Sequence, residues 1–296
     1  MYSIPNYKFL SKEAITENDF TELNQLLKIC QETDSVNVKL ELAYKLSHAN
    51  CKKSDTKQIT EFFCYSDGIL ISYLGICNFG GELNELTGLT HPKWRRQHIF
   101  TQLLQMAISE LKMHNQTKLL LLSDHNSVSG AAFLASVGGI YSFSEYGMQL
   151  LQPVPSPTQQ QVCLRKAQTD DQGNINRINH RLFGDPIIAD TDQEENTDYH
   201  LLDSTYLICH NSNLIGKISI DISDSYAFIY GFGIINEYRG QGLGTKALQE
   251  AIGLIQAKGI TSIGLDVAAA NDRALHIYTS CGFRKQSVMD YYELNI

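Results

Sequence analysis

The sequence lacks the features that mark membrane, secreted and nucleic-acid-binding proteins. Its 296 residues contain no run of about 18 apolar residues that would span a bilayer. Residues 1–5 lack the basic and apolar parts of a secretory signal. Asp and Glu number 32 against 24 Lys and Arg, so the net charge of −8 offers no basic footprint for nucleic acid. We therefore expect a cytoplasmic protein that binds neither membranes nor nucleic acids.

Cysteine is sparse and scattered. The seven cysteines are odd in number and form no Cys-x-x-Cys pair, which disfavours both a disulfide framework and a zinc site. We expect reduced thiols and no metal. An apolar fraction of 43% and a charged fraction of 19% are typical of a globular protein, and this length suggests about two domains.

Proline is rare except at one place. Three of the six prolines fall within residues 153–157, and three glutamines follow at 159–161. Proline fixes φ and removes a backbone donor, so the stretch predicts an extended connector. It divides the chain into domains at 1–152 and 162–296, joined by a linker at 153–161. A long surface loop within one domain is the alternative.

The two halves repeat one order of predicted elements. After an early helix, each half has a hairpin, a strand, a helix, a strand and a helix, followed by terminal strands. In the first half these five elements are predicted at 61–74, 82–89, 100–108, 119–122 and 127–137. In the second half they are predicted at 206–222, 227–235, 242–257, 263–267 and 272–280. The sequence therefore predicts a mixed α/β sheet, twice.

A glycine-rich turn at residues 236–248 carries the strongest chemical signal. It follows an apolar strand and opens a helix. Closely spaced glycines let backbone N–H groups approach an anion, and the helix N-terminus adds partial positive charge. Arg239 can neutralise a second phosphate, so the turn suits a pyrophosphate. The spacing fits neither a Walker loop nor a dinucleotide-binding fingerprint, since Thr245 stands where each needs another residue.

This turn resembles the pyrophosphate loop of the GNAT family, the Gcn5-related N-acetyltransferases. Arg239, Gly242 and Gly244 match the family pattern, and residues 271–283 resemble its later Asn-to-Gly-Phe segment. The resemblance implies two tandem GNAT-like domains, of which the second uses acetyl-CoA and needs no metal. It implies direct transfer of the acetyl group to a primary amine in a ternary complex. The residues implied to contact acetyl-CoA are Ile234, Ile235, Arg239, Gly240, Gln241, Gly242, Leu243, Gly244, Thr245 and Asn271.

The resemblance also implies a general acid. Tyr278 would protonate the departing CoA thiolate, and a packed aromatic is the alternative. Asn271 has a helix-capping alternative. The general base is not identified. Asp221, Tyr230 and Asp266 lie on or beside the predicted core strands and are the candidates, each with a structural role as the alternative.

The resemblance implies a small-molecule or peptide amine as the acceptor, whose identity the sequence leaves open, as it does the oligomeric state. An acidic run at residues 190–198 favours a cationic acceptor, with a solvated loop as the alternative.

The first half resembles the same family more weakly. Arg95 is kept, but His98 and Phe100 replace two glycines of the turn. A histidine there would hinder phosphate approach and disfavour positive φ. Counting from Asn126, the counterpart of Tyr278 is Phe133, which lacks a hydroxyl. We therefore expect a non-catalytic first domain. The rival hypotheses are a CoA or acyl-CoA sensor without turnover, and another nucleotide-binding α/β protein.

Overall fold

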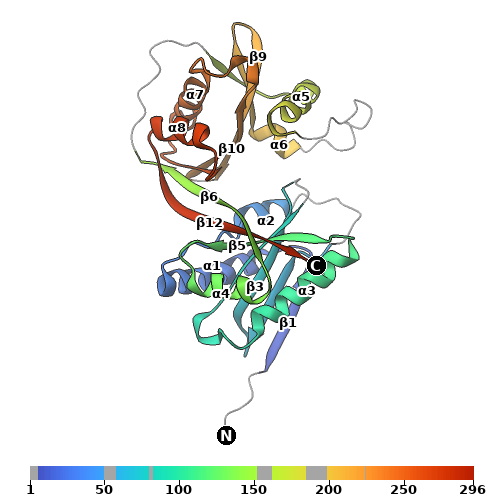
Figure 1. Cartoon of the computed structure of the whole chain (residues 1–296). Helices are drawn as coiled ribbons and strands as arrows, with labels where there is room; N and C mark the ends of the chain where they lie inside the picture. Colours follow the sequence, from blue (N-terminus) through green and yellow to red (C-terminus); the bar gives the residue numbers. More distant parts are fainter. Residues whose placement is uncertain (1–5, 50–57, 80–82, 152–161, 185–198, 224) are drawn as a thin grey trace. The chain divides into compact units, whose positions relative to one another are not determined.

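The chain divides into two compact units. The computed structural model describes residues 6–49, 58–79, 83–151, 162–184, 199–223 and 225–296. Unit 1 comprises Met1–Ser144 and Ser287–Ile296, and unit 2 comprises Glu145–Gln286 (Figure 1). The linker predicted at 153–161 lies outside the described residues, so the domain boundaries at 152 and 162 stay predictions. No helix in the described part of the chain is long and apolar enough to cross a membrane.

Unit 1 is a mixed sheet with helices on both faces. Its strands run in the order β1-β2-β3-β4-β5-β12, and every pair within this order is antiparallel except β4 with β5. The strands are β1 (Tyr7–Lys12), β2 (Glu61–Ser66), β3 (Ile69–Cys77), β4 (Asn84–Thr90), β5 (Lys118–Asp124) and β12 (Phe283–Asn295). The helices are α1 (Glu17–Asp34), α2 (Leu42–Ala49), α3 (Ile99–Met113) and α4 (Val128–Ser136).

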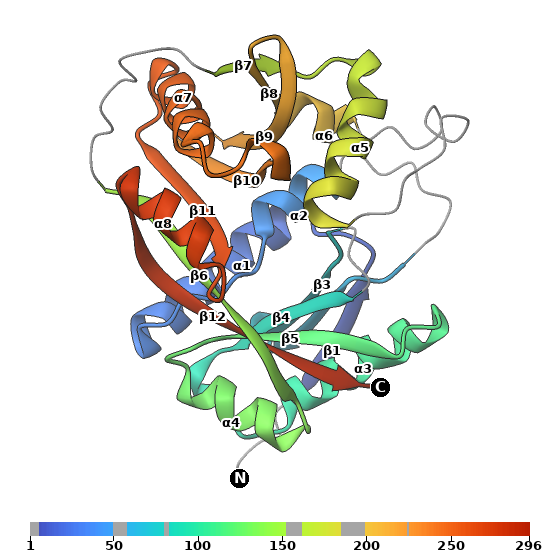
Figure 2. The same cartoon turned by 45° about the horizontal axis from the view of Figure 1, so that its top comes forward.

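Each face of the unit 1 sheet has its own apolar core. On one face, α3 packs Leu103 and Leu111 against strand residues such as Leu74. On the other face, α1 packs Leu23 against Phe63, so that α1 and α3 lie on different sides of the strands (Figure 2). Both helices are amphipathic, and burial of their apolar stripes stabilises this layered arrangement.

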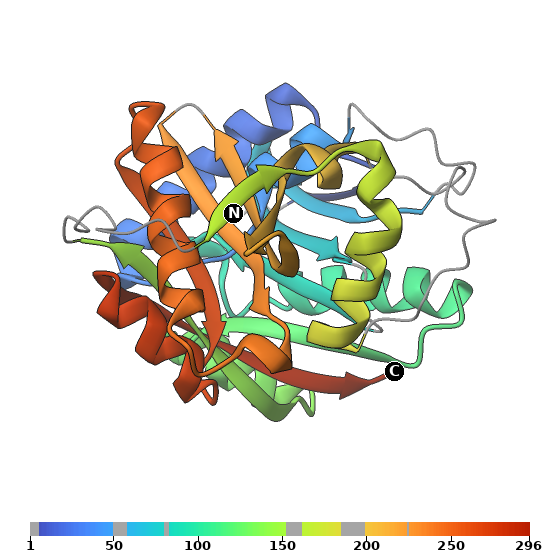
Figure 3. The ribbon, with the colours of Figure 1, turned by 90° about the horizontal axis from the view of Figure 1, so that it is seen from above.

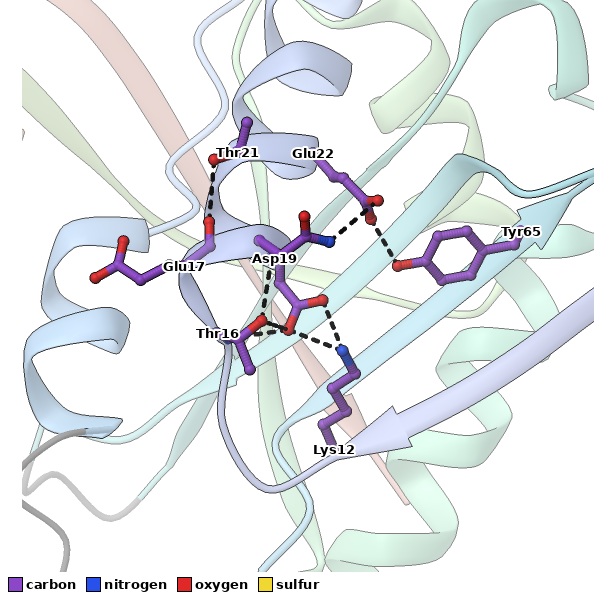
Figure 4. Close-up of polar contacts among 8 residues, drawn as sticks. Lys12, Thr16, Glu17, Asp19, Thr21, Glu22 and Tyr65 are labelled. Atoms are coloured by element: carbon purple, nitrogen blue, oxygen red, sulfur yellow. Dashed lines mark hydrogen bonds and ion pairs between the residues drawn. The ribbon is translucent and has the colours of Figure 1, made fainter.

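Helix α1 begins at a capping box. The side chains of Thr16 and Asp19 each accept a hydrogen bond from the other residue's backbone N–H, and Lys12 Nζ lies 2.6 Å from Asp19 Oδ1 (Figure 4). Burial alone would raise the pKa of Asp19, but the hydrogen bonds from Lys12 and Thr16 lower it. The buried carboxylate is thus held ionised at the start of the helix, where the helix dipole also favours negative charge.

Unit 2 repeats this architecture. Its strand order is β6-β11-β10-β9-β8-β7, with β10 and β11 parallel and the other pairs antiparallel. Figure 3 shows α5 and α7 on opposite sides of the strands. The strands are β6 (Ile140–Leu150), β7 (Cys163–Lys166), β8 (Thr205–His210), β9 (Asn213–Ser223), β10 (Tyr226–Ile234) and β11 (Ser262–Ala268). The helices are α5 (Gln172–Phe183), α6 (Tyr199–Ser204), α7 (Leu243–Ala257) and α8 (Asp272–Ser280).

Strands β6 and β12 each pair with a strand from the other half of the chain. Residues 145–149 of β6 pair with β11 in unit 2, and residues 289–295 of β12 pair with β5 in unit 1. Met148 is 4% exposed in the core of unit 2, and Leu294 is 8% exposed in a core of unit 1. The halves therefore exchange the ends of their terminal strands, which the sequence pattern did not predict.

The hairpins, strands and helices predicted for both halves are confirmed, with ends shifted by a few residues. The two copies are also in register. Helices α3 and α7 begin at Ile99 and Leu243, and α4 and α8 begin at Val128 and Asp272, so both pairs lie 144 residues apart. The same offset relates β2 to β8 and β3 to β9. Each site residue of unit 2 thus has a defined counterpart in unit 1.

Candidate functional site

The glycine turn of unit 2 presents backbone N–H groups to open space. A short 3₁₀ turn (Asn236–Tyr238) leads from β10 toward α7. Gly240 and Gly242 have φ of 78° and 74°, and nothing lies within 4 Å of the point where a Cβ would stand on either. Gly242 is the N-cap of α7 and supplies no side-chain cap. The first-turn amides of α7 therefore have no side-chain cap in this structure, which is the arrangement that an anion site at a helix start requires.

Arg239 has a second role that the sequence did not predict. Its Nε donates a 2.7 Å hydrogen bond to the carbonyl oxygen of Ile234, at the end of β10. The next residue, Ile235, donates its backbone N–H to the carbonyl of Ile215. Ile234 and Ile235 are both buried. Arg239 therefore anchors the turn to the strand, in addition to carrying positive charge beside it.

The remaining predicted residues of the turn divide between surface and core. The amide Nε2 of Gln241 lies 3.4 Å from the carbonyl of Glu237, whereas Leu243 is buried in the core. A Cβ on Gly244 would stand 3.3 Å from the Cδ1 of Ile277, because α7 and α8 lie against each other. Gly244 therefore permits the approach of two helices. Thr245 occupies the first turn of α7.

Strands β10 and β11 separate beside this turn. Their parallel pairing ends at Ile229 and Leu265, so the later residues of the two strands are not paired with each other. At the same place the register between β9 and β10 shifts between Tyr230 and Gly233, which marks a β-bulge. A bulge re-aims the backbone of its strand and is common beside active sites. The predicted strand at 227–235 contained no bulge, although Gly231 and Gly233 within a strand are a signal for one.

Tyr278 lies on α8 and is 8% exposed. It packs 6.3 Å from the ring of Phe232, in the bulge, and 6.2 Å from that of Phe283. Burial raises the pKa of the Tyr278 phenol to about 12, so the hydroxyl keeps its proton at neutral pH. Among the described residues, no hydrogen bond to this hydroxyl is present, so it can donate to a ligand. Asn271 is the N-cap of α8, and its side chain accepts a hydrogen bond from the N–H of Ala274, which supports the capping role.

The three candidate bases lie in different surroundings. Tyr230 begins the bulge, and its hydroxyl is 2.7 Å from the Oγ of Ser204. Asp266 is partly buried on β11, and Asp221 is exposed on β9. Tyr230 is the one that stands at the bulge. The acidic run at 190–198 lies outside the described residues. No group of three His, Cys, Asp or Glu side chains that could hold a metal ion occurs in the part of the chain that the structure describes.

Comparisons with known proteins agree with this geometry. Residues 175–283 match the family model described as the Acetyltransferase (GNAT) family. The chain carries a GNAT-family domain. N-alpha-acetyltransferase 30 of Schizosaccharomyces pombe is 32% identical over 68 residues, which are 23% of this chain and 45% of that protein. The uncharacterized N-acetyltransferase YycN of Bacillus subtilis is 36% identical over 63 residues, 21% of this chain and 40% of that one. The matched segments thus span less than half the length of these curated relatives.

Solved GNAT structures share the fold of both units. A GCN5-related N-acetyltransferase from Sphaerobacter thermophilus has a TM-score of 0.76 at 18% identity, covering 97% of this chain and 95% of its own. A tandem GNAT protein from the clavulanic acid biosynthesis pathway has a TM-score of 0.70 at 16% identity, covering 98% of each chain. The predicted fold, two GNAT-like units in tandem, is therefore confirmed.

The turn of the first GNAT-like unit keeps the backbone shape of the second without its glycines. Arg96 and His98 stand where Gly240 and Gly242 stand in unit 2, and they have φ of 61° and 60°. The histidine thus adopts the left-handed conformation that it disfavours, and it places a side chain where Gly242 leaves open space. The backbone shape of the turn is preserved, but the His98 side chain leaves less space for a ligand to approach the backbone N–H groups of the turn.

Unit 1 differs from unit 2 at the position of the proposed general acid and at the bulge. By the offset of 144 residues, the counterpart of Tyr278 is Leu134, so the sequence assignment of Phe133 was wrong by one position. Leu134, like Phe133, has no hydroxyl, so unit 1 lacks the hydroxyl of Tyr278 with either counterpart. In β4, the pairing with β3 continues without a register shift, so unit 1 also lacks the bulge. Phe100, which replaces Gly244, instead lies 2.7 Å from the point where a Cβ on Gly88 would stand.

A buried polar network occupies unit 1 where unit 2 has Thr205 and Lys217. Lys45 Nζ lies 2.7 Å from Glu61 Oε1, and the hydroxyl of Tyr73 donates a hydrogen bond to the same carboxylate. Tyr73 takes the position of Lys217, and Glu61 that of Thr205. The Lys45–Glu61 ion pair is buried within unit 1.

A cavity of about 630 Å³ remains in unit 1 beside its altered turn. Its lining includes Trp94, Arg95, Phe100, Asp124 and Phe133.

Proposed function

We propose that unit 2 transfers an acetyl group from acetyl-CoA to a primary amine, by direct attack in a ternary complex. The observation that carries this proposal is the pair of left-handed glycines, Gly240 and Gly242, with open space beside them at the uncapped start of α7. This turn suits the pyrophosphate of CoA because its backbone N–H groups and the helix dipole attract a doubly charged anion. The other residues proposed to contact acetyl-CoA are those named from the sequence.

The chemistry needs three groups around the separated ends of β10 and β11. The amine nitrogen attacks the thioester carbonyl, the carbon–sulfur bond breaks, and the amine gives up a proton. Backbone N–H groups of the bulge between Tyr230 and Gly233 support the developing oxyanion. Tyr278 supplies the proton that turns the departing thiolate into the thiol of CoA, because its phenol is protonated at neutral pH. Water takes the proton of the amine, and Tyr230 is the favoured candidate to relay it, because this tyrosine begins the bulge and its hydroxyl is hydrogen-bonded to Ser204.

We propose that unit 1 does not catalyse acetyl transfer. Leu134 supplies no proton in place of Tyr278, His98 narrows the turn, and β4 has no bulge. The cavity of unit 1 supports binding without turnover as a second candidate function, the acyl-CoA sensor. Both proposals suit a cytoplasmic protein.

Acetyl-CoA consumption against a panel of amino-acid amides, peptides, polyamines and aminoglycosides tests the enzyme proposal. We expect turnover with at least one amine, and a fall in kcat of about 100-fold or more in Tyr278→Phe. Tyr238→Phe, in the 3₁₀ turn, is the matched control and should leave kcat unchanged. Binding of CoA without turnover of any amine would refute acetyl transfer and favour the sensor.

A further inference from the structure

Two cysteines of unit 2 lie opposite each other on neighbouring strands. Cys163 begins β7 and Cys209 lies near the end of β8, and the two residues are partners in the antiparallel register. Cys163 is exposed and Cys209 is half-buried. The other cysteines in the described part of the chain are buried free thiols, namely Cys30, Cys64, Cys77 and Cys281. Exposure and position therefore set this pair apart.

The ladder between β7 and β8 brings the two cysteines to the separation that a disulfide requires. The backbone N–H of Ala167 donates a hydrogen bond to the carbonyl of Thr205, four residues along each strand from the cysteines. Hydrogen-bonded pairs recur at every second position of an antiparallel ladder, so Cys163 and Cys209 form such a pair, with Cα atoms about 5.5 Å apart. Disulfides span Cα separations of about 4.4–6.8 Å. Directly opposed residues also share one face of the sheet, so the two sulfur atoms can meet.

The two thiols already interact. Burial raises the pKa of the Cys209 thiol, and Cys163 raises it further by its charge and by a hydrogen bond, whereas Arg165 lowers it. Arg165 stands two residues from Cys163 on β7, so its side chain leaves the same face of the sheet. The thiolate is the reactive form of cysteine, and a neighbouring cation favours it. Because Cys163 is the more exposed of the two, we expect an oxidant to reach it first.

The surroundings of the pair favour a bond that opens and closes. Zinc in structural sites takes four ligands, and within the described ranges no group of three His, Cys, Asp or Glu side chains could hold a metal ion. Disulfides that form in reducing compartments are usually transient and redox-sensing. An exposed disulfide is also open to attack by small thiols.

We propose that Cys163 and Cys209 are a peroxide-sensitive dithiol whose reversible disulfide fixes strand β7 to the sheet of unit 2. The thiolate of Cys163 attacks hydrogen peroxide, the O–O bond breaks, and Cys163 becomes a sulfenic acid while hydroxide leaves. The thiolate of Cys209 then attacks the sulfenic sulfur, the S–S bond forms, and a second hydroxide leaves. The hydroxides take up the two thiol protons, so two thiols and one peroxide give one disulfide and two waters. Two molecules of glutathione reverse the bond by exchange and leave as their own disulfide.

The strand that the disulfide fixes also holds the start of α5. Strand β7 has four residues and is the edge of the unit 2 sheet. Its Arg165 donates two hydrogen bonds of 2.7 Å to the carboxylate of Asp171, the N-cap of α5. Further along α5, the Cδ1 of Leu182 lies 2.7 Å from the point where a Cβ on Gly233 would stand, beside the bulge. The disulfide should therefore reduce the opening of β7 and stabilise unit 2.

Peroxide treatment of the full-length protein, followed by alkylation and peptide mapping without reductant, tests the proposal. We expect one cross-linked pair of peptides that joins Cys163 to Cys209 and that dithiothreitol separates. The four buried cysteines are internal controls and should stay reduced. The oxidised protein should have a Tm about 5 °C or more above that of the reduced protein, and hydrogen exchange in β7 should slow about tenfold or more.

Cys209→Ser and Cys163→Ser are matched variants that each change one sulfur to oxygen. Without Cys209, the sulfenic acid of Cys163 has no partner, so dimedone should label it and peroxide should no longer raise the Tm. Without Cys163, the half-buried thiol of Cys209 should react with peroxide about tenfold or more slowly than Cys163 does in Cys209→Ser. Each variant is compared before and after oxidation, so a change in its basal stability does not affect the result.

The proposal is independent of acetyl transfer, and four results would overturn it. The first is a disulfide of Cys163 with any other cysteine or with a second chain. The second is oxidation of Cys163 while Cys209 is still alkylated, because the opposite thiol then fails to close the bond. The third is persistence of both thiols under conditions that oxidise free glutathione. The fourth is a Cys163–Cys209 bond that leaves the Tm and the exchange of β7 unchanged, which refutes the fixing of the strand.

Discussion

A Leu294→Ala substitution tests whether the last strand of the chain belongs to the first unit. Leu294 is 8% exposed in the core of unit 1, where residues 289–295 of β12 pair with β5. Truncating a leucine this deeply buried costs about 2–5 kcal/mol, from lost transfer energy and from the cavity that remains. At 2 kcal/mol, amide exchange that proceeds through opening of this sheet should accelerate about 30-fold. Met148→Ala is the reciprocal change, since Met148 is buried in unit 2.

Native-state hydrogen exchange with mass spectrometry reads each unit separately. Leu294→Ala should accelerate exchange in residues 61–136, and Met148→Ala should accelerate it in residues 205–280, each more than in the other unit. Chain order alone predicts the reverse, because residue 294 follows the linker and residue 148 precedes it. If Leu294→Ala acts mainly on residues 205–280, the assignment of the exchanged strands is refuted.

Three further changes follow from single sites. Gly242→His should lower the affinity for CoA by about tenfold or more in calorimetry, because a side chain then stands beside the turn; an unchanged affinity would contradict the proposed role of the turn. Lys45→Met leaves the carboxylate of Glu61 buried without its cation, and urea unfolding of unit 1 should show a loss of about 3–5 kcal/mol. Hydrogen bonds from Arg165 hold the pKa of Asp171 at about 2, below its usual 3.8. This pair should therefore stabilise unit 2 fully above pH 3.8 and lose its effect as the pH falls through about 2, and Asp171→Asn should abolish that part of the acid dependence.

Much of the fold was accessible from the sequence because its signals are local. Period 3.6 in residues 242–257 and apolar runs bounded by turn residues in 206–222 depend on near neighbours along the chain. The terminal strands were different. A terminal strand such as β12 fits the edge of either sheet, and the choice between them is made by side chains that are distant in sequence, such as Leu294 in the core of unit 1.

The candidate site also contains features that the local sequence predicted and features that depend on contacts between distant residues. Gly240 and Gly242 were found because a helix start after a strand needs glycine when an anion must approach, which is a local requirement. The bulge of β10 was missed because a register shift is a relation between two strands.

By itself, the sequence determined the repeated order of elements, the glycine turn of unit 2 and its alteration in unit 1, because each depends on residues within about a dozen positions of one another. Only the tertiary structure decided which sheet receives β12, that His98 keeps a left-handed backbone, and that Leu134 is the counterpart of Tyr278. The physical reason is that burial and strand pairing act between residues that are distant in sequence, as Leu294 of β12 does in the core of unit 1.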